Sequence, residues 1–191
     1  MTPILGIIAS ANQGQFISYT AYESIATSTV GAGGASSITF SSIPSTYTHL
    51  QIRTMVKTNE GTTGATNIEM RFNSDTAGNY TRHYLFGTGS SVIAGGNGGA
   101  NLLTTGSAAQ SGVANTFGVT VIDILDYANT NKYKTMRSLS GVNQNTSGSN
   151  FIWGVQSGVW LNTSAITSIS LFSNSSNLSQ YSSFALYGIK G

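Results

Sequence analysis

The chain contains no cysteine and only two histidines in 191 residues. Without cysteine there can be no disulfide, no thiolate metal site and no cysteine nucleophile. With two histidines, and no Gly-x-Ser-x-Gly turn between a strand and a helix, nothing supports a Ser-His-Asp triad. The acidic residues and histidines are isolated rather than spaced as metal ligands. We therefore expect a protein that is not an enzyme and that has no metal or cofactor.

Charge is also scarce, because Asp, Glu, Lys and Arg make up 7% of the chain where roughly 25% is usual. The eight basic residues are scattered, so nucleic-acid binding is not expected. No run approaches the roughly 18–20 apolar residues of a membrane span, so membrane insertion is not expected either. Ser, Thr, Asn and Gly must cover most of the surface. This composition is typical of extracellular or particle-bound β proteins that pack against their neighbours.

Short β-prone runs separated by turn residues dominate the sequence. With almost no helical pattern, they predict an all-β, two-sheet antiparallel β-sandwich. A jelly-roll-like version is preferred, with an immunoglobulin-like sandwich as the alternative. Residues 88–115 have many glycines and few apolar anchors, which predicts a long loop that is either functional or a contact with a partner. The expected strands are 22–30, 37–43, 48–57, 66–73, 80–87, 116–127, 132–141, 150–162, 165–174 and 180–189.

The N-terminus carries an apolar run that is short for a signal peptide and has no basic residue before it. We interpret residues 1–15 as an extended docking arm or first strand, followed by a single domain over 16–191. The arm is expected to dock on a partner by strand addition or in a groove. Its docking residues are predicted to be Ile4, Leu5, Ile7 and Ile8.

The segment VIDILDYANTNKYKTM (121–136) resembles an acid/base cluster, since it holds two aspartates and two lysines. In a regular strand Asp123 and Asp126 point to opposite faces and cannot act as a pair. The Asn-rich centre is a turn sequence. We therefore predict a β-hairpin in which Lys132 and Lys134 form structural ion pairs with a carboxylate.

A second candidate is the face that Tyr80, Arg82 and Tyr84 share on one strand. Arginine interleaved with tyrosine suits an interface or a surface that stacks on a sugar. Trp160 is added as a possible contact or stacking group, although core packing is the default for it. These four residues are the predicted ligand or interface surface.

Several segments together resemble a family of small virion structural proteins of tailed phages of aquatic bacteria, including cyanophages. The resemblance covers most of the chain and leaves 88–112 and 141–150 as the divergent parts. The segments that carry it are PILGIIAS, SSITFSSIPSTYTHLQIR, RFNSDTAGNYTRHYL, FGVTVIDILDYANTNKYKTMRSL, GVWLNTSAITSISLF and QYSSFALYGIKG.

The resemblance implies a β-sandwich component of a virion, assembled in the cytoplasm of the bacterial host, with no catalytic residue to transfer. Its expected partners are copies of itself, as a trimer, and other virion proteins, either the capsid or a tail adaptor. A head decoration (cement) protein is the preferred role. A tail-fibre or spike module that binds host surface glycans is the alternative.

Overall fold

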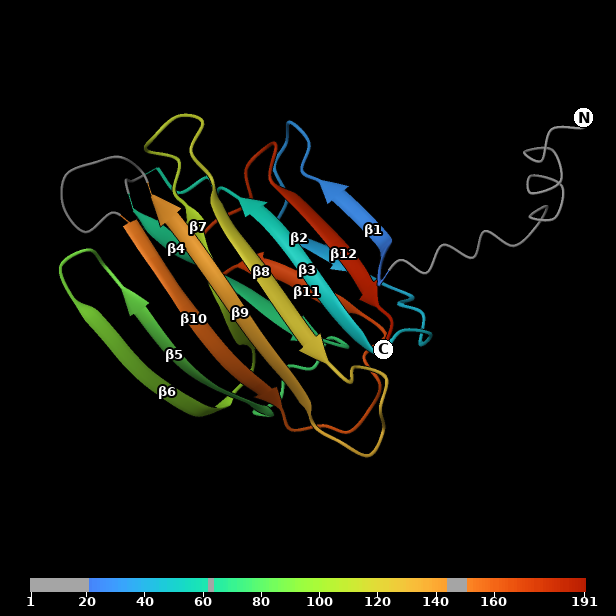
Figure 1. The fold of residues 1–191 in the computed structure, drawn as a ribbon. Coiled ribbons are helices and arrows are strands. Elements are labelled where there is room, and N and C mark those ends of the chain that lie inside the picture. The colour runs from blue at the N-terminus through green and yellow to red at the C-terminus, as the bar shows by residue number, and fades with distance from the viewer. Residues whose placement is uncertain (1–20, 62–63, 144–150) are drawn as a thin grey trace, which may run out of the picture.

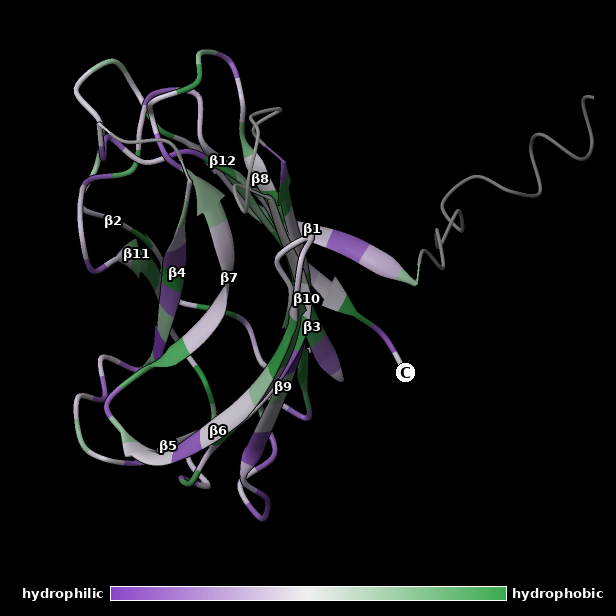
Figure 2. Ribbon diagram, turned by 90° about the vertical axis from the view of Figure 1, so that its left-hand side faces the viewer, coloured by the Kyte–Doolittle hydropathy of each residue, from purple (hydrophilic) through white to green (hydrophobic). Residues whose placement is uncertain are grey.

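The structure, a computed structural model, describes residues 21–61, 64–143 and 151–191, with the side chains of 151–153 left out. Within these ranges the chain forms twelve strands and no helix. The strands form two antiparallel sheets, one of eight strands and one of four, that face each other (Figures 1 and 2). The predicted all-β, two-sheet sandwich is therefore confirmed. The jelly-roll connectivity stays a prediction, and the predicted arm, 1–15, lies outside the described residues.

Strands that follow one another in the sequence often belong to different sheets, so the chain crosses between the two sheets several times. The four-stranded sheet contains, in spatial order, β2 (Ser37–Phe40), β11 (Ile169–Ser173), β4 (Ala65–Phe72) and β7 (Leu103–Ala109). The eight-stranded sheet contains β1 (Tyr22–Thr29), β12 (Ser183–Ile189), β3 (His49–Val56), β8 (Gly118–Leu125), β9 (Lys134–Asn143), β10 (Phe151–Trp160), β5 (Tyr80–Gly87) and β6 (Val92–Ala100).

The core fills the space between the sheets with the inward-pointing residues of each strand. On β8, Ile122 and Ile124 are fully buried, whereas Val119 and Val121 are exposed. Buried and exposed residues alternate because successive side chains of a strand point to opposite faces. Three aromatic residues, Phe72, Tyr80 and Trp160, anchor one end of this core, with ring centroids 5.6–6.4 Å apart. Burial of such large rings contributes a major part of the stability of a sandwich.

A polar turn supports this aromatic cluster from outside. Asp75 accepts hydrogen bonds from the indole Nε1 of Trp160 (2.7 Å) and from the amide of Asn79 (2.8 Å). These donors hold the pKa of the Asp75 carboxyl below its usual range, with the Asn79 amide the largest cause. The Tyr80 hydroxyl accepts the backbone N–H of Phe72 (3.1 Å). The buried rings therefore keep their polar atoms paired.

The predicted hairpin over 121–136 is confirmed: β8 pairs with β9 in antiparallel register. Asp123 and Asp126 do not act together, because Asp123 accepts from Arg137 across the strands (2.9 Å). Asp126 begins the turn with a positive φ of 50° and pairs with Lys132 (2.8 Å). The predicted ion pair of Lys134 with a carboxylate is wrong. Its ammonium is buried and donates to backbone carbonyls instead.

The predicted glycine-rich loop over 88–115 is wrong for most of its length, because β6 and β7 lie within it. β6 pairs with β5 along the edge of the large sheet. β7 is buried throughout and uses small residues to approach the opposite sheet closely. A Cβ on Gly106 would lie 2.4 Å from the Thr120 hydroxyl oxygen and 2.8 Å from the Ser140 Cβ. Small residues are thus required here by sheet-to-sheet packing.

Candidate functional site

The outer face of the eight-stranded sheet carries apolar side chains that are not part of the core. Val121, Leu139, Val155 and Leu85 lie directly opposite one another on the adjacent strands β8, β9, β10 and β5. All four side chains are exposed, Leu139 most of all at 58%. Cross-strand neighbours in such pairs are about 5 Å apart. They therefore form one continuous apolar row, which we call the outer row.

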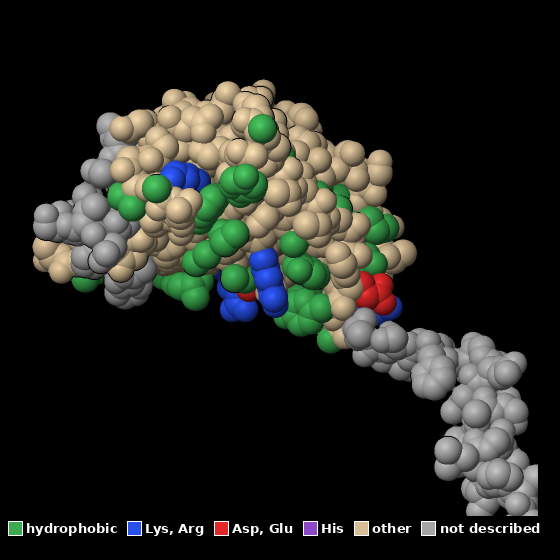
Figure 3. All heavy atoms as spheres, turned by 90° about the horizontal axis from the view of Figure 1, so that it is seen from above, with side chains coloured by type: hydrophobic (Ala, Val, Ile, Leu, Met, Phe, Trp, Pro, Cys, Tyr) green, Lys and Arg blue, Asp and Glu red, His purple; other side chains and the backbone are tan. Residues whose placement is uncertain are grey.

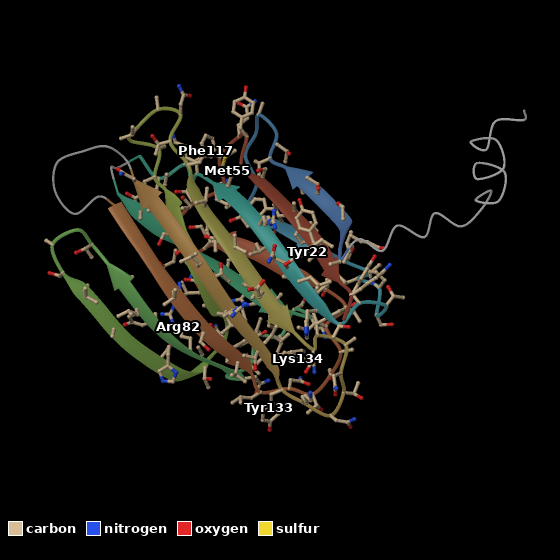
Figure 4. The ribbon with its side chains drawn as sticks, viewed as in Figure 1. Tyr22, Met55, Arg82, Phe117, Tyr133 and Lys134 are labelled. Carbon is tan, nitrogen blue, oxygen red and sulfur yellow. The ribbon has the colours of Figure 1, made fainter. Side chains whose placement is uncertain are left out.

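A second pair of apolar residues widens this surface. Met55 on β3 and Val119 on β8 are cross-strand partners, and both are exposed. In Figure 3 the hydrophobic and basic side chains gather along the lower side, toward the eight-stranded sheet, while the side over the four-stranded sheet is mostly polar. Figure 4 places Met55 toward the upper end of the sheet, away from Lys134.

Polar residues border the outer row on one side. Gln51, Asp123 and Arg137 lie opposite one another on β3, β8 and β9. Asp123 accepts from the Gln51 amide (2.8 Å) with one oxygen and from the Arg137 guanidinium (2.9 Å) with the other. Arg53 in turn donates from Nε to the Gln51 amide oxygen (2.9 Å). Two arginines and one aspartate leave this border with a net positive charge.

Aromatic rings extend the surface toward the edge strand β1. The Arg53 guanidinium carbon lies 5.4 Å from the Tyr187 ring centre and 6.0 Å from that of Tyr22. Tyr22 is an exposed side chain on β1 (Figure 4). Tyrosine and arginine beside an apolar centre are residue types enriched at protein interfaces.

This pattern departs from that of an ordinary antiparallel sheet. A sheet with one face in water usually alternates apolar residues inward with polar residues outward. On β8, however, Ile122 and Ile124 point inward while Val119 and Val121 point outward. A sheet that is apolar on both faces is expected to be covered on both. The outer face is therefore the candidate docking face.

The predicted site residues do not form one surface. Ile4, Leu5, Ile7 and Ile8 lie outside the described residues. Tyr80 and Trp160 are 0% and 1% exposed. Their assignment to an accessible ligand or interface surface is wrong, because both belong to the aromatic core.

Arg82 and Tyr84 have a different location from the other two. They lie half-buried on the inner face of β5, where they line a cleft between the sheets. The Arg82 guanidinium carbon is 5.5 Å from the Tyr84 ring centre, and Arg82 Nε donates to Asn97 Oδ1 (2.9 Å). The structure thus brings these two together but separates them from the docking face.

The outer row was not predicted from the sequence, although a signal for it exists. The run VTVIDIL has apolar residues in both strand phases, and SLS and GVQS each place one aliphatic residue among small or polar ones. Within the sequence of any single strand, one exposed apolar residue does not indicate a surface patch. Only the register between three strands, β8, β9 and β10, brings Leu139 beside Val121 and Val155.

Two buried ionisable groups have structural partners. Lys134 is 0% exposed, and its Nζ donates to the carbonyls of Asn129 (2.5 Å), Lys132 (2.8 Å) and Thr163 (2.9 Å). Burial lowers the pKa of its ammonium below the usual value. Burial likewise raises the pKa of the Glu69 carboxyl, which accepts from the Thr104 hydroxyl (2.8 Å). Lys134 fills all three of its donor positions and so ties the β8–β9 turn to the β10–β11 connection.

Neither a metal site nor a membrane helix is found in the described part of the chain. No group of three or more His, Cys, Asp or Glu residues there could hold a metal ion. No helix among residues 21–61, 64–143 and 151–191 is long and apolar enough to cross a bilayer.

Comparisons with known proteins do not assign the chain to a family. No protein-family model matches it, and no curated protein matches it. Among solved structures it is similar to a candidate pore-forming toxin from Bacteroides vulgatus, at 8% identity and a TM-score of 0.09. The match covers 80% of this chain and 51% of the other, so the chain spans about half the length of that structure. At this TM-score the likeness carries no argument.

Proposed function

We propose that the protein is a non-enzymatic structural subunit of a phage virion, which associates with copies of itself through the outer face of its eight-stranded sheet. The observation that carries this proposal is the outer row, an in-register line of exposed apolar side chains on four adjacent strands. The scarcity of charge, at 7% of residues, supports it further. The resemblance of several segments to small virion proteins is the reason for proposing that this assembly is a phage virion.

The contribution of the outer row to the free energy of association depends on how much apolar surface the contact covers. The four side chains of the outer row are about half exposed. Covering them therefore adds about half of the ~1.5–3 kcal/mol that full burial of each gives, or roughly 3–6 kcal/mol in total. Association costs about 4–15 kcal/mol in lost freedom. The contact must then include the flanking Met55, Val119 and Arg53 as well.

A second copy of the chain is the occupant that fits this face. In the border, hydrogen bonds link Arg53 through Gln51 to Asp123, which pairs with Arg137, so guanidinium groups and a carboxylate face a neighbour of the same sequence. We propose a trimer, in which each copy packs against the next around a closed ring. The N-terminal arm, with Ile4, Leu5, Ile7 and Ile8, then attaches the trimer to the capsid. Head decoration is the preferred role, and a tail position is the alternative.

Particle fractionation tests this proposal. A lysate in which the chain is naturally made is separated on a density gradient, and the chain is quantified in the particle band by mass spectrometry. We expect it to migrate with assembled particles. Hundreds of copies per particle support head decoration, whereas a few tens support the tail alternative. Recovery only as free protein contradicts the proposal.

Deletion of residues 1–12 tests the role of the arm. The truncated protein is expected to keep its melting temperature and its self-association, because the described strands of the sandwich begin at Tyr22. It should no longer bind particles that lack the native protein. Binding equal to that of the full chain would refute attachment through the arm, without affecting the proposed self-association.

A further inference from the structure

A cleft opens between the two sheets, on the opposite side of the large sheet from the docking face. β5 and β10 form one wall, and β4 and β7 form the other. Its volume is about 250 Å³, close to the lower end of the roughly 300–1,000 Å³ range of ligand sites. The apolar core that fills the rest of the sandwich does not extend into this part.

The lining of the cleft is polar but almost uncharged. Five of its eleven lining residues carry an aliphatic hydroxyl or amide side chain, and three of these five are almost fully buried. The polar lining residues are Asn67, Thr104, Ser107, Ser140 and Gln156. Each can donate as well as accept a hydrogen bond. Such a lining matches a ligand that also donates and accepts at several points.

One of these groups lacks a partner within the described residues. The Gln156 side-chain oxygen is shielded from solvent and accepts no hydrogen bond there. A buried acceptor without a donor costs about 1–3 kcal/mol. Native proteins rarely keep such an atom unless a ligand, ion or water completes it. The hydroxyl of Ser138, directly opposite on β9, is likewise shielded and unpaired among the described residues, so a ligand in the cleft meets Gln156 through the rest of its amide.

Arg82 and Tyr84 complete the wall on β5 (Arg82 is labelled in Figure 4). Arg82 uses its Nε to bind Asn97, while its two terminal nitrogens have no hydrogen-bond acceptor among the described residues. The Tyr84 ring packs beside Phe86, with centroids 5.6 Å apart. The cleft thus offers an aromatic ring and a guanidinium side by side.

We infer that this cleft binds a single sugar residue, such as the terminal residue of a glycan. Hydroxyls around a sugar ring match the donor and acceptor lining, and a sugar oxygen can accept from the terminal nitrogens of Arg82, which the Tyr84 ring packs against. A purely apolar ligand would leave the hydroxyl and amide groups of the lining without partners. A phosphate-rich ligand would meet only one cation, Arg82, with the Glu69 carboxyl nearby as an opposing charge. A neutral sugar, or one with a single acidic group, fits best.

The polar side chains of this site lie on the inner side of the sheet and the docking face lies on the outer side, although Leu85 and Val155 of the outer row also border the cleft. Two of the four residues first expected to contact a ligand, Tyr80 and Trp160, take no part in it. Gln156 and Ser140 take their place, and the sequence alone offered no reason to single them out.

Titration with methyl glycosides tests the inference. The methyl glycosides of glucose, galactose, N-acetylglucosamine and glucuronic acid are added to the full chain while two-dimensional NMR follows the Gln156 side-chain amide. At least one glycoside is expected to shift that amide, with a dissociation constant of about 1 mM, as is usual for weak binding by one small ring. No shift from any of them at ten times that concentration would overturn the inference.

Variants locate the binding. Tyr84→Ala removes the ring that packs against the Arg82 guanidinium in the cleft wall and is expected to weaken binding at least tenfold. Gln156→Met keeps the side-chain length, removes the amide from the lining and should weaken binding without lowering the melting temperature. Tyr133→Ala, on an exposed tyrosine outside the cleft (Figure 4), is the control and should bind as the native chain does. Binding unchanged in both Tyr84→Ala and Gln156→Met would place the sugar elsewhere and refute the site.

Discussion

The substitution Leu139→Asp probes the docking face at the centre of the outer row. Leu139 is 58% exposed in the single chain and lies between Val121 and Val155. Covering it in an assembly contributes about 1–1.5 kcal/mol, and a carboxylate buried there without a partner costs a further 2–3 kcal/mol or so. The loss is roughly 3–4 kcal/mol per contact. At 1.4 kcal/mol per factor of ten, the dissociation constant should rise about 100-fold to 1,000-fold.

Sedimentation equilibrium with light scattering measures the effect. The native chain is expected as a trimer and the variant as a monomer at the same concentration. Folding should be almost unaffected, since an exposed strand position usually changes stability by about 1 kcal/mol or less. Tyr181→Asp is the matched control: it changes a 66% exposed side chain in a loop, at a positive φ of 69° that Asp tolerates. A native chain that is monomeric, or a Leu139→Asp chain that stays trimeric, refutes the proposed contact.

Three further predictions concern the stability of the sandwich and are measured by urea unfolding. Lys134→Met leaves the three carbonyls around its ammonium without their donor, so the free energy of unfolding should fall by about 2–3 kcal/mol; a change below 0.5 kcal/mol or so would contradict that role. Burial raises the pKa of Tyr80 from 10.0 to about 12. As the pH rises from 10 toward 12, the unfolded chain therefore loses this proton first, and stability should fall by up to about 1.4 kcal/mol per pH unit. Tyr80→Phe should flatten this slope, and an unchanged slope would show that Tyr80 does not cause it. Gly106→Ala places a Cβ 2.4 Å from the Thr120 hydroxyl oxygen and should cost about 1–3 kcal/mol. The control Gly141→Ala, which meets nothing within 4 Å, should stay within about 0.5 kcal/mol of the native chain.

Local patterns were enough to predict the sandwich and its clearest hairpin. The alternation in β8 and the Asn-rich turn after it placed Asp123 and Asp126 on different contacts, as the structure has them. In contrast, β6 was predicted as loop because glycine has low strand propensity. It becomes a strand through pairing with β5, a tertiary contact that no local pattern of Val92–Ala100 reveals.

The candidate sites were harder to predict, for a physical reason. Strand phase correctly grouped Tyr80, Arg82 and Tyr84 on one face, but phase does not say which face of a sheet is inside. On β5 the shared face turned out to be the inner one, so Tyr80 joined the core and only Arg82 and Tyr84 reach the cleft. Both the outer row and the cleft arise from register and layer packing between distant strands.

A cryo-electron reconstruction of the intact particle tests the central proposal most directly. If the protein is a self-associating virion subunit, the map will show it on the particle in closed rings. The side chains of Val121, Leu139 and Val155 will then be buried against a neighbouring copy. A particle in which the outer face of the eight-stranded sheet remains open to solvent would contradict the account.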